Sequence, residues 1–221
     1  MTTVATPEAK DWNRYWGLDQ TRQFTKISWS KRRIIDVLSP YCNQGAKALD
    51  AGCGSGFFAK YFLDRGMETS ALDYSDEALE IAKKMTQGKA QVFKKDLLST
   101  HLPAEISHRY DLIFSDGLLE HFDPVDQNII LTNFYNLLSE KGILVTFVPN
   151  RFSPWELIRP FYMPGIDEKP FTLKRLIDLH ESSRFRVIAD GGVNTLPFAL
   201  SPDRYFGKQF GMLLYVIAKK I

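Results

Sequence analysis

Short apolar runs alternate with segments of helical periodicity along most of this chain. Seven of these runs have the length and composition of buried strands: residues 46–52, 67–73, 90–95, 110–116, 142–149, 185–192 and 212–219. Strands that alternate with helical segments are typically parallel, because a crossover helix returns the chain to the same end of the sheet. The pattern therefore predicts an α/β fold with one doubly wound, mostly parallel seven-stranded sheet, helices on both faces and an antiparallel last strand.

Between the apolar runs, hydrophobic residues recur every three or four positions, which is the spacing of one helix face. Six segments are predicted to be helical: 11–17, 26–41, 57–66, 75–85, 123–142 and 172–183. Ser75 and Asp123 stand where N-caps are expected. The two helices that precede the first strand are predicted to form a lid or flank.

Residues 150–170 do not follow the helical pattern. They hold four prolines and four aromatic residues at a place where a crossover helix would be expected. A loop of this length is usually either functional or disordered, and its aromatic content argues against disorder. We therefore predict an ordered functional loop here.

Composition and charge narrow the class of protein. The 221 residues are 44% hydrophobic and 24% charged, which suits one domain with a full core. A net charge of +2 gives no global basic field, and the basic residues 31–33 are interpreted as a solvated helix face, so a nucleic-acid partner is not favoured. No signal sequence or membrane-length apolar run is present, and Cys42 and Cys53 are not clustered like metal ligands. We expect a cytoplasmic protein with no membrane partner and no metal site.

The segment "ALDAGCGSGFFAKYF" places glycines at 52, 54 and 56, directly after the first predicted strand. A strand that turns at once into a helix leaves the first N–H groups of that helix unpaired, where polar groups of a ligand can bind them. Glycine permits positive φ values and lets a ligand approach the backbone. A tight turn without a ligand is the alternative. A nicotinamide-type turn is disfavoured, because its third glycine would fall at Phe57.

"LDAGCGSG" resembles the first motif of the class I S-adenosylmethionine-dependent methyltransferases, of the small-molecule type with a methyltransferase 11/25-like domain. The resemblance continues through Asp73, Asp96, "DLIFSDGLLEHF" and "GILVTFVPN", and so covers residues 46–150. It implies a Rossmann-like fold and S-adenosyl-L-methionine as the cofactor. It also implies one domain of 1–221, divided into an N-terminal lid or flank (1–45), a cofactor-binding core (46–149), an acceptor-side insertion (150–171) and a C-terminal helix and hairpin (172–221).

The resemblance assigns cofactor-binding roles to residues at the ends of the first four strands. Asp73 would accept hydrogen bonds from the ribose hydroxyls, since charge-assisted bonds are strong, with Tyr74 beside the adenine. Asp96 would hold the adenine amino group, unless it only stabilises a turn. The expected cofactor-binding set is Asp50, Gly52, Cys53, Gly54, Gly56, Asp73, Tyr74, Asp96, Leu97, Ser115, Asp116 and Gly117. Within this set, Cys53 is interpreted chiefly as a small packed side chain.

His121 and Glu120 are the candidate catalytic residues, because they follow the fourth strand at the edge where the methyl group would project. Histidine titrates near neutrality and suits proton removal from an acceptor. The alternative is that His121 only orients the acceptor or packs the turn. His101, His108 and His180 are interpreted as loop or helix-surface residues.

Two aromatic segments are expected to close over the cofactor and enclose a small, partly apolar acceptor. The candidate acceptor-binding residues are Trp12, Tyr15, Trp16, Trp155, Phe161 and Tyr162. An ordinary helix contact and a packed edge loop are the structural alternatives. Arg14 and Arg159 could pair with an acidic acceptor group, or be surface charges.

The sequence thus predicts an enzyme that transfers a methyl group to an O, N or C atom of a small molecule by in-line displacement. "SDGLLEHF" lacks the Pro-Pro-aromatic motif typical of enzymes that methylate base or amide nitrogens. Two alternatives stay open: methylation of a macromolecule or carrier-bound intermediate, and a non-catalytic S-adenosylmethionine-binding accessory protein. The sequence does not indicate an oligomeric state.

Overall fold

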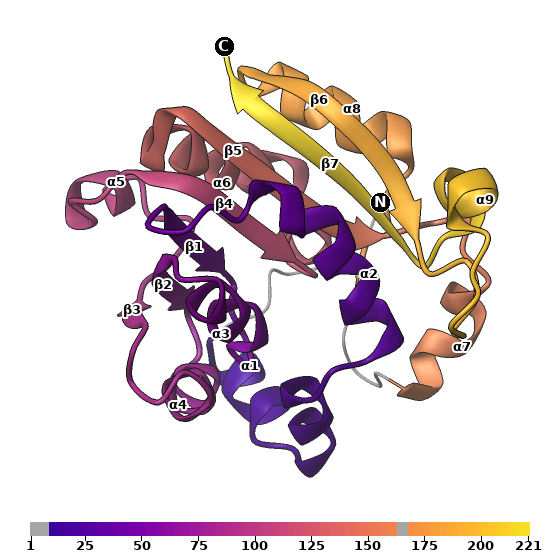
Figure 1. Ribbon diagram of the computed structural model, residues 1–221, viewed down its shortest axis with the longest axis horizontal. Coiled ribbons are helices and arrows are strands. Elements are labelled where there is room, and N and C mark those ends of the chain that lie inside the picture. Colours follow the sequence, from indigo (N-terminus) through magenta and orange to yellow (C-terminus); the bar gives the residue numbers. More distant parts are fainter. Residues whose placement is uncertain (1–8, 163–167) are drawn as a thin grey trace.

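The computed structural model describes residues 9–162 and 168–221, and it contains one seven-stranded sheet (Figure 1). The strands are β1 (Lys47–Ala51), β2 (Glu68–Asp73), β3 (Gln91–Lys94), β4 (Tyr110–Asp116), β5 (Leu138–Pro149), β6 (Phe185–Val193) and β7 (Leu213–Lys220). All seven coincide with apolar runs identified above. The predicted fold class is confirmed.

The strand order is β3-β2-β1-β4-β5-β7-β6. β1 pairs in parallel with both β2 and β4, and β5 continues the parallel set beside β4. β7 runs antiparallel to both of its neighbours, β5 and β6, so the last strand is the antiparallel one, as predicted. The chain order reverses at β1 and β4, and in such sheets ligands bind in the crevice beyond the carboxyl ends of the strands at that point.

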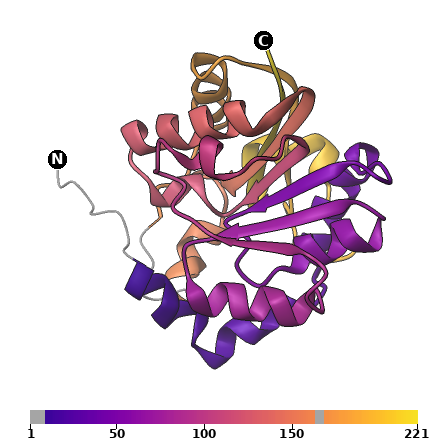
Figure 2. The same ribbon diagram turned by 90° about the vertical axis from the view of Figure 1, so that its left-hand side faces the viewer.

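Helices cover both faces of the twisted sheet (Figures 1 and 2). The α-helices are α1 (Ala9–Trp16), α2 (Trp29–Leu38), α3 (Phe57–Asp64), α4 (Asp76–Met85), α5 (Leu102–Glu105), α6 (Pro124–Leu137), α7 (Trp155–Tyr162), α8 (Leu173–Ser182) and α9 (Asp203–Phe210). Ser75 and Asp123 cap α4 and α6 through their side chains, as their sequence positions predicted. A 3₁₀ segment, η1 (Asp19–Thr25), follows α1.

Alternate residues of the central strands divide the core between the two faces. On β4, Leu112 and Phe114 pack with Phe58 and Phe62 of α3. Ile113 points to the other face, into a cluster that also contains Ile130 and Phe134 of α6 and Leu176 of α8. The same alternation on the neighbouring strands fixes their register.

Three local predictions differ from the structure. The helix expected over 123–142 ends at Leu137, and β5 begins at Leu138, because Leu138 pairs with Tyr110 of β4 and is buried in the core. The loop expected over 150–170 contains α7, and α9 was not anticipated. His180 is fully buried rather than at a helix surface. Its Nδ1 donates to the Leu176 carbonyl (2.8 Å), and Nε2 accepts from Thr146 Oγ1 (3.0 Å).

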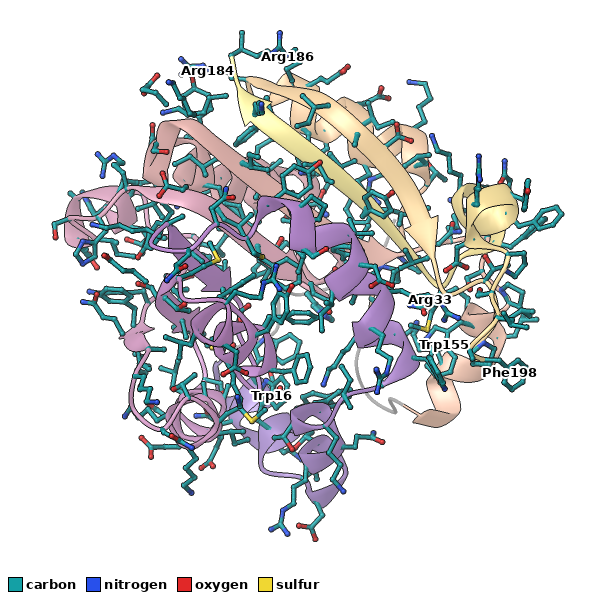
Figure 3. The ribbon with its side chains drawn as sticks, viewed as in Figure 1. Trp16, Arg33, Trp155, Arg184, Arg186 and Phe198 are labelled. Atoms are coloured by element: carbon teal, nitrogen blue, oxygen red, sulfur yellow. The ribbon has the colours of Figure 1, made fainter. Side chains whose placement is uncertain are left out.

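Arg33 joins α2 to the loop that precedes α9 (Figure 3). Its Nη1 donates to Asn194 Oδ1 (2.7 Å), its Nη2 donates to the Phe198 carbonyl, and its Nε lies 3.2 Å from Asp203 Oδ2. Asp203 in turn accepts the backbone N–H groups of Asn194 and Thr195. These contacts fix α2 against the end of β6, far away along the chain.

Candidate active site

The turn between β1 and α3 carries the three glycines in the left-handed region, with φ of +70° at Gly52, +48° at Gly54 and +68° at Gly56. A Cβ on Gly54 would lie 2.3 Å from Cζ2 of Trp16, and one on Gly56 would lie 2.6 Å from Cα of Ala82. Side chains are excluded at both positions. Gly56 therefore lets α3 pack closely on α4, whereas Gly54 lets the N-terminal aromatic residues lie directly on the turn.

Two carboxylates, the buried Asp50 and the half-buried Asp73, hold this turn in place. Asp50 Oδ2 accepts the N–H of Ala59 at 2.9 Å. Asp73, at the end of β2, accepts the N–H of Gly54 through Oδ2 and that of Ser75 through Oδ1, both at 2.9 Å. Burial raises the pKa of Asp50 well above its usual range and also raises the pKa of Asp73, against the lowering effect of these N–H groups. Asp50 thus links the end of β1 to the first turn of α3, and Asp73 links the glycine turn to the end of β2.

Asp116 ends β4 and interacts with Lys31, a residue that was not expected at this site. Burial raises the pKa of Asp116 to about 7, although the positive charge of Lys31 lowers it in part. Burial lowers the pKa of Lys31 to about 8, against the effect of Asp116. Lys31 Nζ donates to the carbonyls of Phe24 and Lys26 and lies 4.1 Å from the ring centroid of Phe57. The interpretation of residues 31–33 as a solvated helix face is therefore wrong for Lys31.

Glu120 and His121 lie on a short 3₁₀ turn, η3 (Leu119–His121), between β4 and α6. Both are buried, with exposed fractions of 2% and 9%. Glu168 approaches this turn from residues 168–170, where the N–H of Lys169 donates to the Glu120 carbonyl at 2.9 Å. One ligand atom from each of Glu120, His121 and Glu168 lies within 4.8 Å of the others. Sequence reasoning found the first two residues and missed Glu168.

The N-terminal segment covers the same region with a chain of edge-to-face aromatic contacts. Ring centroids are 6.0 Å apart between Trp12 and Tyr15, 5.4 Å between Tyr15 and Trp16, and 5.9 Å between Trp16 and Phe24. Trp12 also packs edge to face on His121, at 4.8 Å. α1 is anchored because Ser75 Oγ donates to Asn13 Oδ1 at 2.7 Å. The segment predicted to form a lid or flank thus contacts both the glycine turn and the η3 turn.

These groups surround a cavity of about 330 Å³. Of the residues singled out from the sequence, the lining includes Trp12, Tyr15, Trp16, Asp50, Gly52, Cys53, Gly54, Asp116, Gly117, Glu120, His121 and Trp155. The lining residues not anticipated include Phe24, Lys31, Phe57, Glu168 and Met212. The side chains of Phe161 and Tyr162 lie outside the described part of the structure. The residues singled out from the sequence make up half of the cavity lining.

Six residues expected at the cofactor do not line this cavity: Gly56, Asp73, Tyr74, Asp96, Leu97 and Ser115. Asp96 Oδ1 accepts the N–H of Leu98 at 2.8 Å, which is the turn-stabilising contact considered above, and Leu97 is buried in the core. Tyr74 is 43% exposed at the end of β2. Ser115 is fully buried, and its Oγ has no hydrogen-bond partner among the described residues.

Comparison with known proteins identifies the family to which this chain belongs. A family profile described as "Methyltransferase domain" matches residues 20–186. The chain belongs to this methyltransferase family. The match spans the glycine turn, the η3 turn and α8, and it confirms the family predicted from the sequence.

Curated relatives of this methyltransferase domain match it in part. The malonyl-(acyl-carrier protein) O-methyltransferase of Hamiltonella defensa is 29% identical over 133 residues, which are 60% of this chain and 48% of that protein. The ubiquinone biosynthesis O-methyltransferase of Nitrosospira multiformis is 33% identical over 84 residues, which are 37% of this chain and 35% of that protein. The matches thus span half or less of the length of these relatives.

Solved methyltransferase structures share the fold over nearly the whole chain. A SAM-dependent methyltransferase from Anabaena variabilis superposes with a TM-score of 0.70 and 20% identity, over 100% of this chain and 99% of that one. Magnesium protoporphyrin IX methyltransferase from Synechocystis, crystallised with bound SAH, gives a TM-score of 0.69 at 13% identity, over 96% of this chain and 99% of that one. At these identities the likeness shows the fold.

Proposed function

We propose that this chain transfers the methyl group of S-adenosyl-L-methionine to an O, N or C atom of a small molecule. The proposal is carried by one observation: a single cavity is lined at once by the glycine turn and by Glu120 and His121. A cofactor on the turn and an acceptor beside η3 would share one enclosed space, as in-line displacement requires. Because the curated relatives are named as O-methyltransferases, oxygen is the first acceptor atom to test.

The residues around the turn fit an adenosyl cofactor. Each carboxylate oxygen of Asp73 accepts one backbone N–H, which leaves further lone pairs for ribose hydroxyls. Gly52 and Gly54 carry no side chains, so the methionine end of the cofactor could reach the backbone of the turn once the Trp16 ring, which lies on Gly54 here, moves aside. In this proposal Tyr74 and Asp96 serve the adenine, which would lie beyond the described cavity along the ends of β2 and β3.

The bound cofactor would supply an activated methyl group, so the protein has to align the acceptor and exclude water. Trp12 and Trp16 cover the cavity, which serves the second task. A hydroxyl acceptor loses its proton as the O–CH₃ bond forms and the S–CH₃ bond breaks, and the electron pair of the broken bond stays on sulfur. His121 and Glu120 are the groups placed to receive that proton. A carboxylate acceptor would need no proton transfer.

Calorimetric titration with S-adenosylmethionine, S-adenosylhomocysteine and NADH tests the cofactor part of the proposal. We expect the first two to bind and NADH not to bind. Asp73→Asn should weaken S-adenosylhomocysteine binding at least about tenfold, because hydrogen bonds to charged groups contribute about 1.5–3 kcal/mol. Asp178→Asn, on an exposed face of α8, is the matched control. Binding of NADH alone, or unchanged affinity in Asp73→Asn, would contradict the proposal.

Turnover with a panel of small phenols, carboxylic acids and amines tests the reaction itself. We expect S-adenosylhomocysteine to form only when a suitable small acceptor is present. Cofactor binding without turnover on any member of the panel would favour the accessory-protein alternative. Turnover only on a carrier-bound acyl group would favour the carrier-bound alternative.

A further inference from the structure

Glu120, His121 and Glu168 form a compact group of three ligand-type side chains at the acceptor side of the cavity. Their ligand atoms lie within 4.8 Å of one another. The group is assembled by tertiary structure, since the Lys169 N–H donates to the Glu120 carbonyl and the neighbouring Phe171 N–H donates to the Pro149 carbonyl, both at 2.9 Å. Glu168 is therefore held beside η3 by backbone hydrogen bonds of the residues that follow it.

The group is buried, and its carboxyl groups share Arg159 with Glu156. Glu120 is 2% exposed and the side chain of Glu168 is 5% exposed. Glu120 Oε2 is buried and has no hydrogen-bond partner among the described residues. Arg159 Nε lies 3.5 Å from Glu168 Oε2, but it also pairs with Glu156 at 3.3 Å. A buried carboxylate oxygen without a partner is costly, which indicates that a cationic group belongs there.

We propose that Glu120, His121 and Glu168 bind one divalent transition-metal ion, such as Zn²⁺ or Mn²⁺. Carboxylate oxygens suit Mn²⁺ and imidazole suits Zn²⁺, so a mixed set of two carboxylates and one imidazole accepts either ion. Ligand bonds of about 2.1 Å place the ligand atoms about 3–3.5 Å apart, so the side chains would have to draw in by about 1 Å. Three protein ligands leave coordination positions open to the cavity, as in catalytic rather than structural sites.

The consequence for catalysis rests on the proposed function. An ion at this position would lie at the wall of the cavity that Trp12 and Trp155 also line, where its open positions would bind and orient an acceptor oxygen. His121 would then act as a metal ligand instead of a general base. This differs from the sequence-based expectation of no metal, because Glu168 lies far from the Glu-His pair along the chain and forms no recognisable ligand spacing with it.

Direct metal binding tests the proposal without any methyl acceptor. The purified protein is stripped with a chelator and titrated with Zn²⁺ by calorimetry and with Mn²⁺ by electron paramagnetic resonance. We expect one equivalent to bind, and Glu168→Gln and His121→Ala each to weaken binding at least about tenfold. Glu181→Gln and His101→Ala, at exposed positions, are the matched controls and should bind as the native protein does.

S-adenosylhomocysteine binding and the far-ultraviolet circular dichroism of each variant report on folding. Native-like values in Glu168→Gln together with lost metal binding would support the site. No stoichiometric binding of either ion, or equal binding in Glu168→Gln and the controls, would overturn it. Metal binding in a protein that binds no S-adenosylhomocysteine would support the metal site and contradict the proposed function, so the two are separable.

Discussion

His180 is expected to make the folded protein less stable as the pH falls below neutrality. Its ring is fully buried between α8 and β5. Burial lowers its pKa from 6.5 to about 4, because the Leu176 carbonyl offsets only part of the cost of a buried charge. In the unfolded chain the same ring takes up a proton near pH 6.5. Its contribution to stability is therefore complete above pH 6.5 and is lost as the pH falls toward 4.

The size of the effect follows from this difference in pKa. A fall from 6.5 to about 4 corresponds to about 3.5 kcal/mol, at about 1.4 kcal/mol per pKa unit. Asp116 and Glu168 act in the opposite direction over the same range, because burial raises the pKa of each to about 7. The pH dependence of the native protein alone would mix these effects, so the contribution of His180 has to be measured as a difference between variants.

The assay is urea unfolding of the native protein and of His180→Asn at a series of pH values. Asparagine removes the titrating ring and keeps an N–H donor near the Leu176 carbonyl. Between pH 7.5 and 4.5, the stability of the native protein relative to the variant should fall by about 2.5 kcal/mol. His101→Asn, at an exposed position, provides the baseline for losing a histidine. A constant difference across this range would refute the reasoning.

Two further substitutions test the turn and the core. Gly54→Ala places a Cβ 2.3 Å from Trp16 Cζ2 at a φ of +48°. We therefore expect the free energy of unfolding to fall by about 1–3 kcal/mol and the tryptophan fluorescence to change. An unchanged fluorescence spectrum would contradict this prediction. Asn133→Ala removes both donors from the Leu97 and Ser99 carbonyls, so urea unfolding should show a loss of about 1–3 kcal/mol. The exposed Asn136→Ala should cost little, and equal losses in both variants would argue against the buried hydrogen bonds.

Most of the fold could be predicted because its signals are local. Each strand contains a short apolar run, and caps such as Ser75 and Asp123 act on N–H groups two or three residues away. The boundary between α6 and β5 could not be predicted this way. Residues 138–141 continue a helical pattern, and only the pairing of Leu138 with Tyr110 on another strand draws the chain into the sheet.

The candidate site likewise contains residues that local motifs indicate and residues that only tertiary contacts bring in. The glycine turn and the Glu120–His121 pair are contiguous motifs, and the sequence identified them. Lys31 and Glu168 reach the cavity only because α2 packs beside β4 and because residues 168–171 hydrogen-bond to η3 and β5. Contacts between residues so far apart along the chain leave no periodic or motif signal in a single sequence.

The position of β7 also bears on how the protein is made. A ribosome adds β6 to the chain before β7, yet β7 lies between β5 and β6 in the finished sheet. A nascent chain that has reached Val193 therefore exposes an unpaired edge on β5, including the apolar residues Val145 and Phe147. Unpaired strand edges invite association with other chains. We expect ribosome-bound chains truncated before Leu213 to need a chaperone, whereas chains that extend past Lys220 can close the sheet themselves.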